Sequence, residues 1–421
     1  MLHVRLNARV IASTPTAPVL DEMRRTGATE PGLARMMTKA EALALAMEHI
    51  ERRQANLLKQ EMLAAGGDAA VHHGVCSEAV DETRVVLVGT RRQFTALVAR
   101  LAEEPLDLPA VGEVIRRALE AYGRRRFEIP MGPHRLVVGP KPALMGIVNV
   151  TPDSFSRDGL AGDPEAAVAL GLRMAEAGAD LLDIGGESTR PGSDPVSEDE
   201  ERRRVLPVVE GLARRGRTPI SIDTRRARVA REALAAGACL VNDVTALGGD
   251  PAMAATVAKS GAGLVLMHMQ GEPKTMQDRP VYDNLMADIC RFLRQSMALA
   301  AEAGVPEERI LVDPGIGFGK TLADNLQVLA RLGQLRTLGR PILVGPSRKR
   351  FLGDLTGVRT PADRTYGTAA ACALAVAAGA LVLRVHDVPE MRQALAVAGA
   401  MAEAGLPAVA LRQAEAGETI A

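Results

Sequence analysis

Two groups of polar residues in this chain suit binding and catalysis better than structural stability. Three accept hydrogen bonds from N–H groups: Asp223, Asn242 and Asp313. Three are donors or cations that suit an oxyanion such as phosphate or diphosphate: Lys349, Arg384 and His386. These groups on opposite sides of one pocket predict a flat nitrogen heterocycle with a phosphorylated arm as the ligand. The alternative is a structural ring of salt bridges.

The elements that must position these residues are short apolar stretches typical of buried strands. Eight such stretches end near Asn149, Gly185, Asp223, Asn242, His268, Asp313, Gly345 and His386. Arg384 and His386 are two residues apart in the last stretch, so they point to the same side. Helical patterns lie between the stretches. Eight strand–helix units in about 260 residues predict an α/β fold, a closed (β/α)8 TIM barrel. A doubly wound open sheet is the alternative.

The first 125 residues predict a smaller α+β domain. Helical patterns cover residues 32–53, 54–65, 91–103 and 112–122, and strand patterns cover residues 3–12, 69–74 and 84–89. The basic turn Gly123–Arg126 marks the boundary, so we expect domains at residues 1–125 and 126–421. The role of the first domain stays open.

Composition excludes several classes of function. Lys+Arg and Asp+Glu both count 51, and the chain has no Trp, three Tyr and six Phe. We therefore expect neither a nucleic-acid partner nor a membrane partner. The four cysteines are scattered without CxxC spacing, which predicts reduced residues in a cytoplasmic protein.

The segment Asp313–Lys320 has three alternating glycines after a strand but lacks the spacing of a P-loop. We expect these glycines to provide backbone clearance at the barrel rim, and Lys320 to be solvated.

Six segments together resemble the dihydropteroate synthase family, over roughly residues 127–405. They are MGIVNVTPDSFS (145–156), DIGGESTRPG (183–192), LMHMQGEPKTMQ (266–277), DPGIGFGK (313–320), SRKRFLG (347–353) and RVHDV (384–388). The resemblance implies an enzyme of folate biosynthesis. It would condense 6-hydroxymethyl-7,8-dihydropterin diphosphate with 4-aminobenzoate to 7,8-dihydropteroate. It also implies a Mg²⁺ cofactor, sulfonamide sensitivity and a homodimer.

The resemblance also implies roles for individual residues. Asp223, Asn242, Asp313 and Lys349 would bind the pterin. Asn149, Arg190, Arg384 and His386 would bind the diphosphate, with Asn149 near the metal. Phe155, Thr189, Pro191, Phe318, Ser347 and Arg350 would line the aminobenzoate pocket. Catalysis would fall to Lys349, Arg384 and His386.

Two other functions compete with this interpretation. A pterin-dependent methyltransferase would resemble the segments around Asn242 and Asp313, but it has no need for the cationic ends Ser347–Lys349 and Arg384–His386. A pterin-binding protein without turnover is the second, supported only by the added domain and by residues 156–160, which differ from the family's usual pattern.

Overall fold

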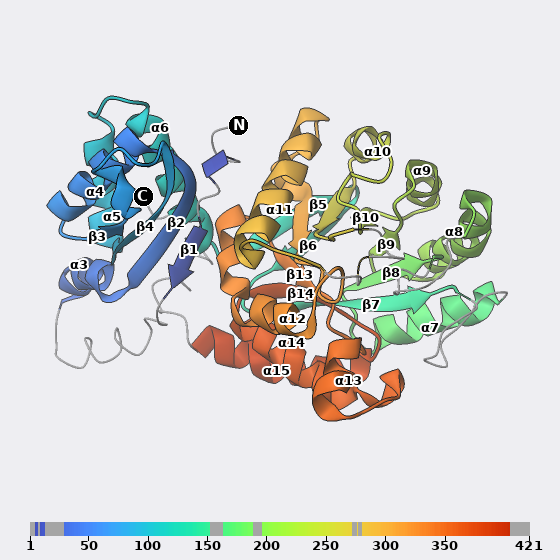
Figure 1. Ribbon diagram of the computed structural model, residues 1–421. Coiled ribbons are helices and arrows are strands. Elements are labelled where there is room, and N and C mark those ends of the chain that lie inside the picture. Colours follow the sequence, from blue (N-terminus) through green and yellow to red (C-terminus); the bar gives the residue numbers. More distant parts are fainter. Residues whose placement is uncertain are drawn as a thin grey trace. The chain divides into compact units, whose positions relative to one another are not determined.

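The computed structural model describes residues 5–6, 9–12, 29–151, 163–187, 196–271, 276 and 280–404. It divides into two compact units (Figure 1). The described residues up to Arg125 form the first unit together with Gly333–Gly339 and the described residues 401–404, and the second comprises Arg126–Leu332 and Arg340–Ala400.

The first unit is built on a four-stranded antiparallel sheet in the order β1-β2-β4-β3. Its strands are β1 (Arg9–Ala12), β2 (Ala42–Glu51), β3 (Asp68–Ala70) and β4 (Glu82–Thr90). Its helices are α3 (Glu30–Ala40), α4 (Arg52–Ala64), α5 (Arg91–Leu101) and α6 (Leu108–Gly123). Strands β2 to β4 and helices α4 to α6 share one apolar core that includes Leu45 of β2 and Phe94 of α5.

One predicted helix in this unit is wrong. Residues 42–51 were expected to continue the helix over residues 32–53, but they form strand β2. The segment ALALAMEHIE consists mostly of helix-forming residue types, and these suggested the helix. Its large apolar residues Leu43, Leu45 and Met47 occupy every second position and are buried in the sheet core. Here the period of two, which is the period of a strand, overrides intrinsic propensity.

The second unit is a closed barrel of eight parallel strands, β7 to β14. The strands are β7 (Ala143–Asn149), β8 (Leu181–Gly185), β9 (Ile220–Asp223), β10 (Leu240–Asp243), β11 (Gly263–Met267), β12 (Ile310–Asp313), β13 (Ile342–Val344) and β14 (Ala380–Val385). The helices are α7 (Pro164–Glu176), α8 (Glu198–Arg215), α9 (Ala227–Ala235), α10 (Met253–Ser260), α11 (Leu285–Glu302), α12 (Leu322–Ala330), α13 (Arg350–Thr356), α14 (Thr365–Ala377) and α15 (Val388–Ala404). The predicted TIM barrel is confirmed.

The barrel interior is apolar at the N-terminal ends of its strands. Leu181, Leu240, Leu311 and Val382 belong to one buried cluster there. A hairpin of β5 (Phe127–Met131) and β6 (His134–Val138) contributes Ile129 to the same cluster. Because side chains alternate along a strand, residues two positions further on face the same interior. Those positions carry the polar residues described next.

Among the described residues, no helix combines the length and the apolar character that a membrane span requires.

Candidate active site

A polar layer lies directly above the apolar cluster in the barrel. Asp183, Asn242, Asp313 and Arg384 follow Leu181, Leu240, Leu311 and Val382 at a spacing of two residues. Asp223 ends β9, which pairs with both β8 and β10. The strand ends predicted from sequence therefore meet in one barrel mouth.

Arg384 lies between two carboxylates. Its Nε donates to Asp183 Oδ2 at 2.6 Å, and its Nη2 donates to Asp223 Oδ2 at 2.7 Å. The sequence had placed the carboxylates and the cations on opposite sides of the pocket, and for Arg384 this is wrong. The reason is the strand order β14-β7-β8-β9, which puts two acidic strand ends within reach of the long side chain.

Asp183 was not predicted as a site residue. It is fully buried, and its Oδ2 also accepts a hydrogen bond from Asn242 Nδ2 at 3.0 Å. The predicted strand-end segment begins at Asp183, but this residue was assigned no role, and it lies inside β8 rather than at its end. Its position two residues after Leu181 is the signal that would have found it.

Burial shifts the acid–base properties of both predicted pterin carboxylates. It raises the pKa of Asp223 to about 7, against the opposing effect of the Arg384 guanidinium. Burial also raises the pKa of Asp313, while Lys349 opposes the shift. Asp313 Oδ1 accepts a hydrogen bond from the Gly315 backbone N–H at 2.6 Å, which fixes the carboxylate at the start of the glycine-rich segment.

Lys349 lies beside this segment. Its ammonium donates to the Ile316 carbonyl and lies 4.6 Å from the centroid of the Phe318 ring. Burial lowers the pKa of Lys349 to about 8, while Asp313 opposes the shift. The backbone of Lys349 is held by Arg364, which donates to the carbonyls of Arg348 at 3.0 Å and Lys349 at 3.2 Å. The structure therefore brings Lys349 close to both Phe318 and Asp313.

His386 contacts Ser347 through two polar contacts. Ser347 Oγ lies 3.0 Å from His386 Nδ1, and it accepts a hydrogen bond from the His386 backbone N–H at 3.2 Å. The serine is buried, so its hydroxyl is a support for the imidazole. The sequence had predicted Ser347 in the aminobenzoate pocket.

Lys320 is not solvated, contrary to the expectation from sequence. Its side chain is only 2% exposed, and its Nζ lies 2.9 Å from His268 Nδ1 and 3.1 Å from the Phe318 carbonyl oxygen. Burial lowers its pKa to about 7. The clearance expected of the glycines is confirmed, because a Cβ at Gly315 or Gly319 would collide with the carbonyl oxygen of His268 or Gln270.

Of the remaining predicted residues, Asn149 lies next to Asp223 at the mouth, because its Oδ1 and Asp223 Oδ2 would each lie 3.7 Å from a Cβ at Gly185. Asn149 ends β7 and pairs with Gly185. Arg350 is 91% exposed and pairs weakly with Asp354 at 3.6 Å. Phe155, Thr189, Arg190 and Pro191 lie outside the described residues.

Comparison with known proteins decides the family. The protein-family model described as pterin binding enzyme matches residues 145–386 of this chain. The chain belongs to the pterin-binding enzyme family. Dihydropteroate synthase of Synechocystis is 43% identical over 273 residues, which are 65% of this chain and 94% of the relative. A structure of dihydropteroate synthase from Xanthomonas albilineans in complex with 7,8-dihydropteroate is 46% identical, with a TM-score of 0.56, and covers 63% of this chain and 95% of its own.

A third relative extends over both units of this pterin-binding chain. It is a probable bifunctional folylpolyglutamate synthase/dihydropteroate synthase of Halobacterium salinarum, 42% identical over 380 residues. The match covers 90% of this chain and 45% of the relative. The chain thus spans about half the length of the bifunctional relatives that it matches.

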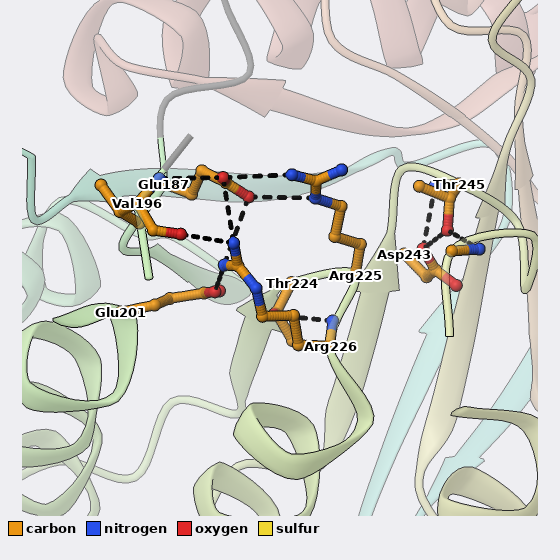
Figure 2. A network of polar contacts seen from close by, with 9 residues as sticks. Glu187, Val196, Glu201, Thr224, Arg225, Arg226, Asp243 and Thr245 are labelled. Carbon is orange, nitrogen blue, oxygen red and sulfur yellow. Dashed lines mark hydrogen bonds and ion pairs between the residues drawn. The ribbon is translucent and has the colours of Figure 1, made fainter. Parts of the chain in front are cut away.

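A second polar network of this pterin-binding enzyme lies beside the mouth (Figure 2). Arg226 donates to Glu187, to Glu201 and, at 2.6 Å, to the carbonyl oxygen of Val196. Glu187 also accepts a hydrogen bond from the Val196 backbone N–H at 3.3 Å and one from Arg225 Nε at 3.1 Å. The network therefore ties the chain at residue 187 to the chain at residue 196. The sequence carried no signal for it, because its partners come from three separate segments.

Proposed function

We propose that this chain is a dihydropteroate synthase. It would condense 6-hydroxymethyl-7,8-dihydropterin diphosphate with 4-aminobenzoate, forming 7,8-dihydropteroate and releasing diphosphate. One observation carries the proposal: the buried acceptors Asn242 and Asp313 and the partly buried Asp223 share one barrel mouth with the cations Lys349 and Arg384. The named activity of the Synechocystis relative and the product bound to the Xanthomonas enzyme support it.

The ring of the pterin presents N–H groups along one edge, and the acceptors match that pattern. Asp313 and Asp223 supply carboxylate oxygens, and Asn242 supplies a carbonyl oxygen. Burial makes the ionised carboxylates unfavourable without a partner, as their raised pKa values indicate. A ligand that donates hydrogen bonds to them relieves this penalty.

The cations stabilise the leaving group. The bond between the pterin methylene carbon and the diphosphate oxygen breaks, and its electron pair leaves with diphosphate. The methylene cation is delocalised into the pterin, and the aminobenzoate nitrogen attacks it and then loses a proton. Lys349, Arg384 and His386 stabilise the developing negative charge. Because an arylamine is already neutral at pH 7, Asp223 and Asp313 serve in binding rather than as an acid–base pair.

Magnesium fits this site through one protein oxygen. No group of three or more His, Cys, Asp or Glu residues that could hold a metal occurs among the described residues. Mg²⁺ commonly takes few protein ligands, with phosphate oxygens and waters as the rest. The Asn149 carboxamide at the end of β7 would hold it, with Arg190 also on the diphosphate side. When bound, the ion neutralises charge on the diphosphate.

The aminobenzoate pocket would be formed by Phe155, Thr189, Pro191, Phe318, Ser347 and Arg350. Phe318 is half-buried beneath the Lys349 ammonium, and the exposed Arg350 follows directly at the start of α13. This arrangement supports an aromatic ring near Phe318 with its carboxylate toward Arg350. A sulfonamide would occupy the same space and compete with 4-aminobenzoate.

We also propose two domains, residues 1–125 and 126–421, and a cytoplasmic homodimer. All four cysteines are free, which supports a reducing compartment. Leu355 of α13 and Tyr366 and Leu374 of α14 are exposed apolar side chains on neighbouring helices, which supports self-association there. The first domain carries none of the proposed site residues.

The test is an assay of the full chain with both substrates and Mg²⁺, in which dihydropteroate is identified by mass. We expect one dihydropteroate for each diphosphate released, and no release without 4-aminobenzoate. Binding of the pterin diphosphate without any product would instead identify a pterin-binding protein without turnover.

A further inference from the structure

Asp183 contacts residues of both halves of the proposed site. It lies in β8 below the barrel mouth, and none of its side chain is exposed. Its Oδ2 accepts hydrogen bonds from Nδ2 of Asn242 at 3.0 Å and Nε of Arg384 at 2.6 Å. Its Oδ1 has no hydrogen-bond partner among the described residues. One buried carboxylate therefore contacts a residue proposed to bind the ring and a residue proposed to bind the diphosphate.

The contact with Asn242 selects which end of the amide a ligand meets. An ionised carboxylate only accepts hydrogen bonds, so Asn242 must direct its NH2 group to Asp183. The carbonyl oxygen of the amide is then left for the ligand. Together with Asp223 and Asp313, it makes the ring side of the site a set of acceptors. With a neutral partner at position 183, the amide could turn and place a donor in that set.

The contact with Arg384 fixes the plane of the guanidinium. Asp183 accepts a hydrogen bond from Nε and Asp223 accepts one from Nη2, so two of the three guanidinium nitrogens are held and the plane of the group is fixed. The side chain remains 21% exposed, which leaves part of it accessible from the mouth. A guanidinium held in this way is ready to donate to phosphate oxygens without a search for its orientation.

We propose that Asp183 is a positioning residue that sets the amide orientation of Asn242 and the guanidinium plane of Arg384. This inference rests on the proposed function. The chain offers a matched control in Asp243, an equally buried carboxylate at the end of β10. Asp243 accepts hydrogen bonds from Thr245 and Leu247 of its own turn.

The ring half is tested with hydroxymethylpterin, which lacks the diphosphate, in calorimetric titrations of the full chain. Asp183→Asn should weaken its binding by roughly fivefold or more. In an Asn242→Ala background the same change should alter affinity by less than about twofold, because its effect passes through that amide. An equal loss in both backgrounds would show that Asp183 acts on the barrel in general and would overturn this half.

The anion half is tested with inorganic pyrophosphate. Asp183→Asn removes a negative charge and also releases the Arg384 guanidinium, and these two changes can shift pyrophosphate affinity in opposite directions. The decisive quantity is therefore whether the effect of the variant depends on Arg384, whichever direction the affinity changes. Its effect on pyrophosphate affinity should be roughly fivefold or more with Arg384 present and should vanish in an Arg384→Gln background. Persistence of the effect without Arg384 would contradict the proposal. Asp243→Asn should leave both affinities within about twofold of the wild type.

A second variant separates the position of the carboxylate from its charge. Asp183→Glu keeps the charge but displaces the carboxylate, so it should also weaken the binding of hydroxymethylpterin. A role for charge alone predicts wild-type affinity. The wild-type titrations separate the two levels of inference. If the wild type binds neither ligand, the proposed function fails and this inference fails with it. If it binds both and the couplings are absent, only the role of Asp183 fails.

Discussion

The lower and upper layers of the barrel interior differ in chemistry although they lie on the same strands. Leu181, Leu240, Leu311 and Val382 form the lower layer, and Asp183, Asn242, Asp313 and Arg384 form the upper layer two residues later. The lower layer stabilises the fold through buried apolar area. Asp223 and Lys349 lie at the same mouth and are counted with the upper layer from here on. Burial raises the pKa of Asp313 and Asp223 and lowers that of Lys349. Charged groups are therefore held where their charged forms are unfavourable, which is typical of a binding site.

The largest effect is expected from the lower layer. Leu311→Ala creates a cavity in a fully buried position and should reduce the free energy of unfolding by about 2–5 kcal/mol. Hydroxymethylpterin affinity of the folded protein should stay near the wild-type value. Urea denaturation and calorimetry measure the two quantities. A large loss of affinity with little loss of stability would mean that the layers are not separate in function.

The upper layer should respond in the opposite way. Lys349→Met removes a buried ammonium and should lower the rate of diphosphate release by roughly 10²–10³-fold, because the leaving group loses a stabilising cation. The free energy of unfolding should be unchanged or higher, since burial disfavours the charged form. Steady-state kinetics and urea denaturation on one preparation give both values. A variant that unfolds readily yet retains its rate would reverse the comparison.

The pH dependence of stability isolates one carboxylate of the upper layer. Burial raises the pKa of Asp223 from 3.8 to about 7. Between these values the native state keeps a proton that the unfolded chain has released. The free energy of unfolding contributed by this group is therefore highest below its unfolded pKa and falls as pH rises toward about 7. Asp223→Asn should show a shallower fall than the wild type in urea denaturations between pH 4 and pH 7, and equal slopes would refute the shift.

The smallest effect is expected at the rim of the site. Arg350 is almost fully exposed, so its interaction with the aminobenzoate carboxylate is screened by water. Arg350→Ala should raise the KM for 4-aminobenzoate by at most about fivefold and leave the KM for the pterin diphosphate unchanged. An effect on the pterin substrate alone would place Arg350 on the other side of the site.

The sequence predicted the barrel and most of the upper layer for a physical reason. The C-terminal ends of parallel strands meet at one end of a closed barrel, so Asp223, Asn242 and Asp313 could be assigned to one mouth from local patterns alone. Lys349 and His386 followed from the same rule. These predictions need no knowledge of which strands are neighbours.

The predictions for Arg384 and Lys320 failed because they depended on contacts with residues distant in the sequence. Arg384 contacts Asp183, 201 residues away, and Lys320 contacts His268, 52 residues away. Neither pairing follows from the composition or period of its own segment. Strand β2 failed for a local reason, because its helix-forming residue types conflict with its period of two. The assignments of Phe155, Thr189, Arg190 and Pro191 stay predictions.

The central claim is that one polar layer binds the pterin ring through hydrogen-bond acceptors and the diphosphate through cations. Crossed titrations of Asp313→Asn and His386→Gln with hydroxymethylpterin and pyrophosphate test it most directly. We predict that Asp313→Asn lowers the affinity for hydroxymethylpterin by roughly tenfold or more and does not lower the affinity for pyrophosphate. His386→Gln should weaken pyrophosphate and leave hydroxymethylpterin within about twofold. Equal losses of both ligands in both variants would contradict the division of the layer.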